Sequence, residues 1–539
     1  MNIMRKRNRQ LRRAMMLVAA FTVAVTSLSQ VPASQGRQQL VVTIVVDQLR
    51  TDYVELLRHR FGKDGFNRLI DRGAYIENLH FDIAQPDIAN TTAMLFTGAY
   101  PAVNGVAGEK IYRLNTRQPD FALSDPARIG NFTNETFSPV ALQVSTLADE
   151  LRCDTQYGLV YSLATDAQQA IIMAGHAANS AFWISDIDGK WATSTYYKDV
   201  PRAITECNYK MPLTERMDTM AWTPSLKPEE YIDVHSHKQY TRFRHTFAKN
   251  DRDRFIRFKH SPLANEEVTR MALEYLASLK MGKRGTTDML CLGLTAAPYD
   301  FSGDGNNAIE LQDTYLKLDA QIARLLHAVD AQVGLQNAVV VLTSTGYYSD
   351  NTLYDERLGI PSGEFFPARA ISLLNMYLMA IYGNGDWVSG YYNGSFYLNR
   401  DLIKTKDLDL GTVRAKSSEF LRQMSGVSAA YNFEEILNNP SSAEAHRLHR
   451  CMVPAVAGDI TIEVAPGWRI VENERSKKNK QVHIVRYNAI STPAFIMARG
   501  VAPRKISAPV EATILAPSVS RILRVRSPNA ARELPLSLQ

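Results

Sequence analysis

The residue whose position first suggests chemistry is Asp47, which directly follows an apolar run over residues 40–46. A nearly continuous stretch of β-branched and apolar residues is typical of a central strand in a parallel sheet covered on both faces. In open α/β sheets, ligands bind beyond the carboxyl ends of the strands. Asp47 is therefore placed where a metal ligand or a catalytic acid would stand. The alternative is an ordinary turn residue at the end of a strand.

A second segment, residues 86–98, predicts a turn, a short helix and a glycine stop. Asn90 or Thr91 would suit the first turn of that helix. A helix N-terminus that faces a strand end is a natural anion site, because its first N–H groups lack partners within the helix. The same pattern also begins any ordinary helix. A glycine-punctuated loop follows over residues 100–109 and ends in Glu109.

The first 36 residues predict a secretory signal. Six basic residues lie within the first 13 positions, and an apolar run over residues 14–29 is followed by small residues. This run is short for a membrane span, and an uncleaved anchor is the alternative. We therefore expect an exported protein, periplasmic or extracellular, with no transmembrane span after the signal is cleaved.

The charge balance gives no reason to expect a nucleic-acid partner. The whole chain has 61 basic and 55 acidic residues, but six of the basic residues lie in the leader, which has no acidic ones. The mature chain therefore carries 55 of each sign and no net charge. A neutral protein of this kind has no electrostatic preference for nucleic acids or anionic membranes.

Four cysteines, Cys153, Cys207, Cys291 and Cys451, are widely spaced. The absence of any C-x-x-C pair excludes a zinc-ribbon arrangement. An exported protein could pair them, but the sequence does not indicate which cysteines would be joined. Cys291 lies in an apolar, strand-like run, which predicts a buried thiol.

The elements that must hold these residues alternate along the chain. Buried strands are predicted over residues 158–164, 170–176, 289–295 and 338–343, and helices over residues 50–72, 142–151, 266–279 and 311–333. A strand, helix and strand in this order form a βαβ unit. Residues 185–260 are rich in polar and aromatic side chains with weak periodicity, which predicts a cap-like insertion. We expect one large α/β domain over residues 37–539.

Five motifs occur in the order found in one known family: Val45-Val-Asp47-Gln-Leu-Arg, Phe96-Thr-Gly-Ala-Tyr-Pro101, Ala174-Gly-His176, Asp313-Thr-Tyr-Leu-Lys-Leu-Asp319 and Ala516-Pro-Ser518. Together they resemble the alkaline phosphatase superfamily, specifically the monomeric Thr-nucleophile alkaline phosphatases grouped with type I phosphodiesterases/nucleotide pyrophosphatases. The resemblance implies a three-layer sandwich, with a mostly parallel central sheet between helices. It also implies two zinc ions at the strand ends, which activate a nucleophile and stabilise the leaving oxygen.

The resemblance implies six zinc ligands, and only Asp47 and His483 match them. The two ligands of an Asp-x-x-Gly-His motif are missing from residues 297–301, where Asp300 lies one position from the expected His. An Asp-His pair is replaced at residues 345–346. Asp47 and His483 would serve opposite metals in the family. We therefore expect no cofactor unless the site has been rebuilt to hold zinc.

The other catalytic positions implied by the resemblance also differ. The nucleophilic Thr aligns with Ala89, and Thr91 lies close to that position. The Asn that contacts the phosphoryl oxygens aligns with Glu109, a carboxylate that would repel phosphate or replace a metal ligand; the favoured alternative is a solvent-facing loop carboxylate. A Lys-x-Arg pair aligns with Asp166 and Gln168. The sequence thus offers Thr91 and Glu109 as candidate catalytic residues and assigns none.

Three functional hypotheses follow. The first is an exported pseudoenzyme, silent for metal-dependent phosphate ester hydrolysis, that binds or scaffolds an envelope protein or ligand. The second is a hydrolase of phosphate mono- or diesters with a rebuilt metal site that uses Asp47 and His483. The third is a structural subunit of an envelope assembly, which would expose the aromatic side chains of residues 377–397 as a partner surface.

Overall fold

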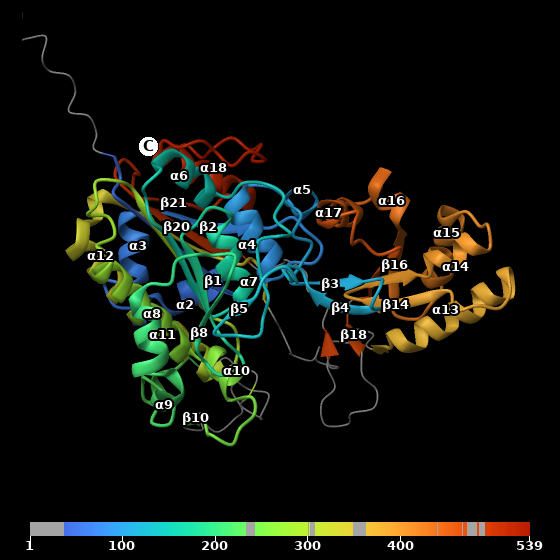
Figure 1. Cartoon of the computed structure of the whole chain (residues 1–539), viewed down its shortest axis with the longest axis horizontal. Coiled ribbons are helices and arrows are strands. Elements are labelled where there is room, and N and C mark those ends of the chain that lie inside the picture. The colour runs from blue at the N-terminus through green and yellow to red at the C-terminus, as the bar shows by residue number, and fades with distance from the viewer. Residues whose placement is uncertain are drawn as a thin grey trace, which may run out of the picture. The chain divides into compact units, whose positions relative to one another are not determined.

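A large mixed sheet forms the centre of the protein in a computed structural model (Figure 1). The structure describes residues 37–538 except 233–242, 300, 302–307, 349–362, 439, 466, 472–481 and 484–490. The strands run in the order β21 (Arg504–Ile506), β2 (Ala74–His80), β20 (Thr492–Met497), β12 (Ala338–Ser344), β1 (Leu40–Asp47), β11 (Asp288–Thr295), β6 (Val160–Ala164), β7 (Ser180–Ile184), β8 (Trp191–Ser194) and β5 (Gly130–Asn131), with β22 (Val510–Glu511) also paired to β2.

The middle of this sheet is parallel. Strands β12, β1, β11, β6 and β7 all run in the same direction, whereas β20 and β8 are antiparallel to their neighbours. All eight residues of β1 are buried, as a strand between two parallel neighbours and two helical layers requires. Asp47 lies opposite Thr295, the last residue of β11. The predicted strand therefore ends in Asp47 at the carboxyl edge of the sheet.

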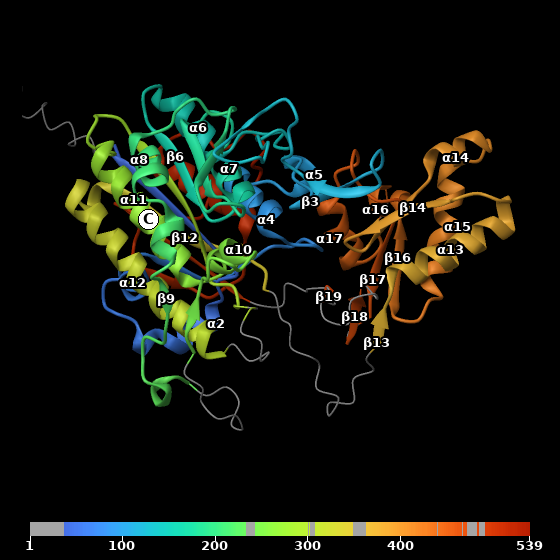
Figure 2. The same ribbon diagram turned by 60° about the horizontal axis from the view of Figure 1, so that its bottom comes forward.

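Helices cover both faces of the sheet (Figures 1 and 2). Alternate β1 residues pack into two separate cores, with Val42 and Ile44 in one and Val41 and Val45 in the other. The first core includes α2 (Thr51–Leu57), α3 (Phe66–Arg72), α11 (Pro262–Ser278) and α12 (Ala308–Val333); the second includes α4 (Ile88–Thr97), α6 (Leu147–Thr155), α7 (Ala167–Ala174) and α18 (Leu515–Leu523). These layers confirm the three-layer α/β sandwich.

The helix predicted over residues 50–72 is interrupted between α2 and α3. The Asp319 carboxylate accepts hydrogen bonds from the main-chain amides of Gly62 (2.9 Å) and Phe66 (2.7 Å). A Cβ at Gly65 would clash with the same carboxylate, so only glycine allows this close approach. The apolar spacing continues across the break, because both halves pack against the same core.

The strand predicted over residues 170–176 is wrong, since residues 170–174 belong to helix α7 (Ala167–Ala174) and the last two follow its end. Asp166 caps its N-terminus by accepting a hydrogen bond from Gln169 N (2.8 Å), and Gly175 ends it with a φ of +67°. Every residue of α7 is buried. A helix that is buried on all sides has no polar face, so its sequence lacks the period that distinguishes it from a buried strand.

Residues 185–260 contain one strand of the main sheet and several short elements. They are β8, α8 (Arg202–Lys210), α9 (Leu213–Met217), β9 (Ala221–Trp222), η2 (Pro228–Glu230), β10 (His245–Thr246) and α10 (Arg254–Lys259). Strands β9 and β10 pair with each other in a separate two-stranded sheet. Among the described residues, no helix has the length and apolar character needed to cross a membrane.

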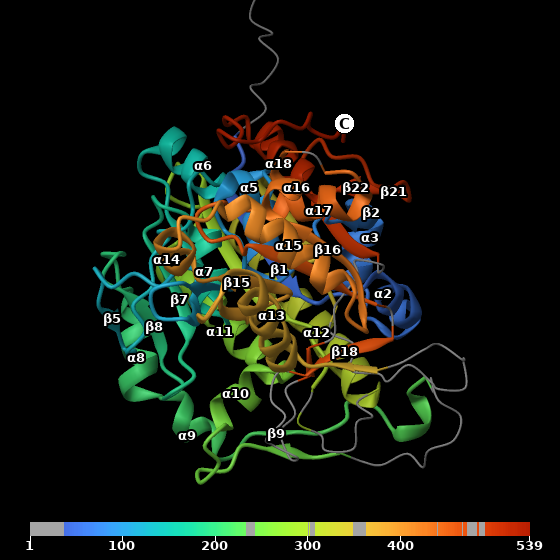
Figure 3. The ribbon, with the colours of Figure 1, turned by 90° about the vertical axis from the view of Figure 1, so that its right-hand side faces the viewer.

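A second sheet has a core of its own (Figures 2 and 3). Its order is β14 (Val388–Tyr392), β15 (Ser395–Leu398), β17 (Ile460–Val464) and β16 (Val427–Asn432), and it packs with α13 (Pro367–Tyr382) and α15 (Leu410–Arg422). Trp387 and Phe396 are fully buried in this core. Much of the aromatic stretch over residues 377–397 therefore serves internal packing.

Candidate active site

Asp47 is held at the end of β1 by neighbouring polar groups. Its carboxylate accepts hydrogen bonds from the Thr345 hydroxyl (2.9 Å) and from Gln48 Nε2 (3.2 Å), and only 9% of the side chain is exposed. Burial raises the pKa of Asp47, although the hydrogen bonds from Tyr347, Thr345 and Gln48 act in the opposite direction. Asp47 thus stands in the predicted place, but its oxygens are already bonded to protein.

Asp87 caps the N-terminus of α4. Its Oδ1 accepts hydrogen bonds from the amides of Ala89 (3.0 Å) and Asn90 (2.9 Å). The Asp87 amide in turn donates to Asn90 Oδ1, which completes a capping box. Its Oδ2 accepts a hydrogen bond from Glu109 N (2.7 Å). Burial raises the pKa of Asp87 to about 6, in spite of these three amide donors.

Glu109 lies beside Asp87 at the end of the glycine loop. Burial, followed by the charges of Asp166 and Asp87, raises the pKa of Glu109 to about 7. Asp166, at the N-terminus of α7, also has a pKa raised by burial. Helices α4 and α7 pack against each other in the same core, which brings their two N-terminal carboxylates to one site.

Asp47, Asp87, Glu109 and Asp166 together form what we call the carboxylate cluster. The charge of Asp166 raises the pKa of each of the other three. Like charges disfavour simultaneous ionisation, and with pKa values of about 6 for Asp87 and about 7 for Glu109 a neutral and an ionised carboxyl can coexist here at neutral pH. A protonated and an ionised carboxyl group in one site are the components of general acid–base and nucleophilic catalysis.

Thr91, a candidate from the sequence, lies in the first turn of α4. Its hydroxyl is fully buried and donates to the carbonyl oxygen of Asp87 (2.5 Å). This is the back-bond of a threonine inside a helix. Asp87 was not proposed from the sequence, although a Pro-Asp pair followed by Asn three residues later is a capping pattern that indicates it.

The zinc pair of the family does not fit the residues at the ligand positions. Gly346 has a φ of +76°, and any Cβ there would clash with the Phe81 ring, so a His at this position has no room. Tyr299, within the lost Asp-x-x-Gly-His segment, is packed against Trp222 (5.2 Å between centroids) and His245 (4.6 Å). In the described part of the chain, no group of three or more His, Cys, Asp or Glu side chains could hold a metal ion.

The other candidate residues from the sequence lie partly or wholly outside the described residues. The main chain of His483 lies in β19 (Val482–His483), which pairs with β18 (Trp468–Val471), but its side chain lies outside the described residues. Asp300 and the signal segment 1–36 also lie outside them. The predicted burial of Cys291 is confirmed, and the four cysteines are free thiols.

Comparison with known proteins defines the class. The family described as type I phosphodiesterase / nucleotide pyrophosphatase matches residues 41–487, so the chain belongs to this family. It is 26% identical to alkaline phosphatase PafA of Elizabethkingia meningoseptica over 93% of this chain and 94% of that protein, and 25% identical to alkaline phosphatase PhoV of Synechococcus elongatus over 93% and 92%. The crystal structure of wild-type PafA superposes with a TM-score of 0.79 at 25% identity, covering 93% of this chain and 99% of that one.

These relatives overturn the first functional hypothesis. The expectation of a silent pseudoenzyme is wrong, because relatives that align over nearly the whole chain are named alkaline phosphatases. The expectation of no cofactor, unless the site has been rebuilt to hold zinc, is not supported by these relatives either. Lost ligand positions do not by themselves mean lost activity, because other carboxylates are present, such as Asp87 at the N-terminus of α4.

Proposed function

We propose that this chain is a hydrolase of phosphate mono- or diesters with a rebuilt active site at the carboxylate cluster. Its membership of the type I phosphodiesterase family and its similarity to proteins named alkaline phosphatases support the reaction class. The observation that carries the proposal is the pair Asp87 and Glu109. Asp87 caps the N-terminus of α4 and accepts a hydrogen bond from the main-chain amide of Glu109, so both residues lie where the resemblance places the nucleophile and a phosphoryl-binding Asn.

The two carboxyl groups have different environments and suit different roles. Asp87 is bonded to three amides, which favours its ionised form, and one lone pair of Oδ2 has no amide donor. No hydrogen bond from a main-chain amide acts on the pKa of Glu109, which lies near three other carboxyls. Asp87 is therefore the nucleophile and Glu109 the general acid and base.

The proposed reaction has two steps. Asp87 Oδ2 attacks phosphorus, the bond from phosphorus to the leaving oxygen breaks, and the Glu109 carboxyl gives its proton to that oxygen. Water then attacks the phosphorus of the aspartyl phosphate while the Glu109 carboxylate takes up a proton. This step releases phosphate and restores both residues. Burial raises the pKa values of Asp47 and Asp166, the two other members of the cluster.

The proposed reaction does not use a zinc pair, because the residues at its ligand positions do not fit one. A metal ion in a rebuilt site would be bound by Asp47 and by ligands outside the lost positions. The sequence predicts His483 as one of them. Asp and His are ordinary zinc ligands, and each catalytic zinc requires about three of them.

The test is turnover of 4-nitrophenyl phosphate and bis(4-nitrophenyl) phosphate between pH 5 and 9, with and without added divalent metal ions. We expect turnover by the wild-type protein, and an acid-quenched sample should carry one phosphoryl group on the peptide that contains Asp87. Asp87→Asn should abolish both signals, whereas Asp71→Asn, at an exposed carboxylate on α3, should leave them unchanged. Blank results with every ester and metal would refute the proposal.

A further inference from the structure

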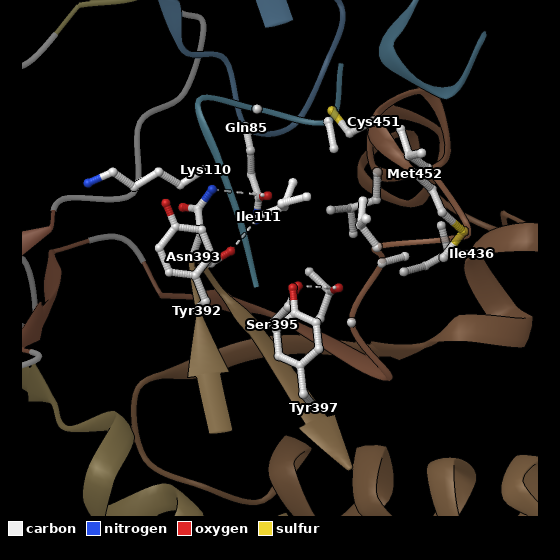
Figure 4. A pocket seen from close by; sticks show the side chains of 18 residues that line it. Gln85, Lys110, Ile111, Tyr392, Asn393, Ser395, Tyr397, Ile436, Cys451 and Met452 are labelled. Atoms are coloured by element: carbon white, nitrogen blue, oxygen red, sulfur yellow. Dashed lines mark hydrogen bonds between the residues drawn. The ribbon is translucent and has the colours of Figure 1, made fainter. Parts of the chain in front are cut away.

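A cavity of about 80 Å³, open to solvent, lies beside the glycine loop (Figure 4). One side is formed by Gln85, by Ala107 and Gly108 of the glycine loop, and by Lys110 and Ile111 of β3 (Lys110–Arg113). The opposite side is formed by the β14–β15 hairpin and by the end of α17 (Ala443–Cys451) with the turn that follows it.

The walls of the cavity differ in character. Tyr392 and Tyr397 contribute aromatic surface, and the Tyr397 ring is stacked on Tyr112 with centroids 4.3 Å apart. Ile436 and Met452, both buried, contribute an apolar surface. Figure 4 shows the tyrosines and these apolar side chains on different sides of the same space. A flat apolar ring would contact both walls.

Polar groups around the cavity are neutral with one exception. Gln85 Nε2 donates to the carbonyl oxygen of Asn393 (2.8 Å), and Ser395 shares a hydrogen bond with Thr461 (3.0 Å between hydroxyl oxygens). The exception is Lys110, whose ammonium group lies over the Phe121 ring (4.8 Å). This lining favours an uncharged ligand that has a few hydrogen-bonding groups, because no carboxylate or guanidinium lines the cavity to neutralise an ionic one.

The cavity and the carboxylate cluster share a wall at Gly108. This residue lines the cavity, and a Cβ placed on it would lie 2.7 Å from Asp87 Oδ2. Gly108 and Lys110, which flank Glu109 in the sequence, both line the cavity. A substrate whose phosphorus lies at Asp87, and whose leaving oxygen lies at Glu109, would thus have its organic group beside this space.

We propose that the cavity binds the organic group of the ester, and that this group is an uncharged aromatic ring. The assignment rests on the proposed hydrolase function, since it names the substrate class of that site. It predicts selectivity for aryl esters over small alkyl esters that comes from binding in the cavity, in addition to any difference in leaving-group reactivity.

Two tryptophan variants separate the cavity from its surroundings. Ala457 lines the cavity, whereas Ala455, two residues earlier, is exposed and does not line it. We expect Ala457→Trp to lower kcat/KM for 1-naphthyl phosphate at least tenfold and to change that for methyl phosphate less than twofold. Ala455→Trp should change neither. Equal losses for both esters in Ala457→Trp, or no loss for either, would overturn the assignment.

Binding of 1-naphthol, measured by calorimetry, tests the cavity proposal separately from the hydrolase proposal. The wild type and Ala455→Trp should bind it, and Ala457→Trp should bind at least tenfold more weakly. If the wild type hydrolyses no ester, this binding pattern would refute only the hydrolase and keep the cavity as an aromatic-ring site. Equal binding in all three proteins would overturn the cavity. Val456→Phe, on the same wall, replaces Ala457→Trp if circular dichroism shows that variant to be unfolded.

Discussion

The main-chain amide of Glu109 donates a 2.7 Å hydrogen bond to the side chain of Asp87, 22 residues earlier in the sequence. This bond joins the glycine loop to the N-terminus of α4. Three main-chain amides donate to the Asp87 carboxylate and favour its ionised form, whereas burial and the charges of Asp166 and Asp87 raise the pKa of Glu109. The roles proposed for the two residues follow from this difference.

Exchange of the two carboxyl groups for amides should separate their contributions. Asp87→Asn removes the nucleophile, and we expect kcat/KM for 4-nitrophenyl phosphate to fall by about 10³-fold or more. Glu109→Gln removes the proton donor and should cost about 10²- to 10⁴-fold. Thr91→Val should cost less than about threefold, because the Thr91 hydroxyl is bonded to the main chain. A larger loss in Thr91→Val than in Asp87→Asn would identify Thr91 as the nucleophile instead.

The pH profile should have a single maximum in the mildly acidic range. Activity requires ionised Asp87, so it should rise as pH passes the pKa of about 6. It also requires protonated Glu109, so it should fall as pH passes the pKa of about 7. We expect kcat/KM to peak between these values. An optimum above pH 8.5 would contradict the assignment and favour a metal-activated hydroxyl group.

Metal analysis should distinguish a rebuilt site from the zinc pair of the family. We expect at most one metal ion per chain after purification with zinc, because Gly346 and the segment around Tyr299 cannot supply their former ligands. Asp47→Ala and His483→Ala should each remove the ion that is bound. Elemental analysis of the dialysed proteins measures this directly. Two ions per chain in the wild type would show that other residues have replaced all four lost ligands.

A buried charge group outside the site should dominate the stability of α11. Glu267, 1% exposed, pairs with Arg216 (2.7 Å) and Arg270 (2.7 Å) and accepts a hydrogen bond from Trp191 Nε1 (3.0 Å). These partners lower the pKa of Glu267 to about 2 despite its burial. Glu267→Gln should lower the free energy of unfolding by about 3 kcal/mol, as loss of one partner in a buried ion pair does. Glu266→Gln, at the neighbouring, more exposed position, is the control in a urea titration.

The pair formed by His176 and Asp149 should make stability depend on pH. The Nδ1 atom of His176 lies 2.9 Å from Asp149 Oδ2, and this bond raises the pKa of His176. The pKa of Asp149 is lowered by the bond from His176 and by main-chain amides, against the effect of burial. Stability from the pair is therefore complete between about pH 4 and 6.5, the unfolded-state values. It is lost as pH rises through the folded pKa of His176 or falls through that of Asp149.

His176→Gln tests this pair. The imidazole is 37% exposed, so solvent screening limits the effect to about 1 kcal/mol or less. Urea midpoints should differ between the wild type and His176→Gln at pH 6 and converge by pH 9. A difference that stays constant over this range would show that packing rather than charge is responsible.

Much of the fold could be predicted from the sequence because its strongest signals are local. The apolar run that ends in Asp47 and the 3.6-residue stripe of α12 identify the buried strand β1 and the helix that connects β11 to β12, without any long-range contact. The five motifs indicated the family of the protein, and the match over residues 41–487 confirms it. Local pattern failed at α7, because a helix buried on every side has no amphipathic period.

Which residues come together at the candidate site depends on the packing of segments that are distant in the sequence. The sequence alone predicted that Asp47 ends a central strand, and the resemblance implied that most of the family's zinc ligands are absent. Only the tertiary structure decided that the charges of Asp166, Asp87 and Asp47 act on Glu109, because these residues belong to separate elements that the sheet and the packing of α4 against α7 bring together. Spacing along a chain reports which residues share a helix or strand, whereas a pKa depends on charges and burial that arise only when the elements pack.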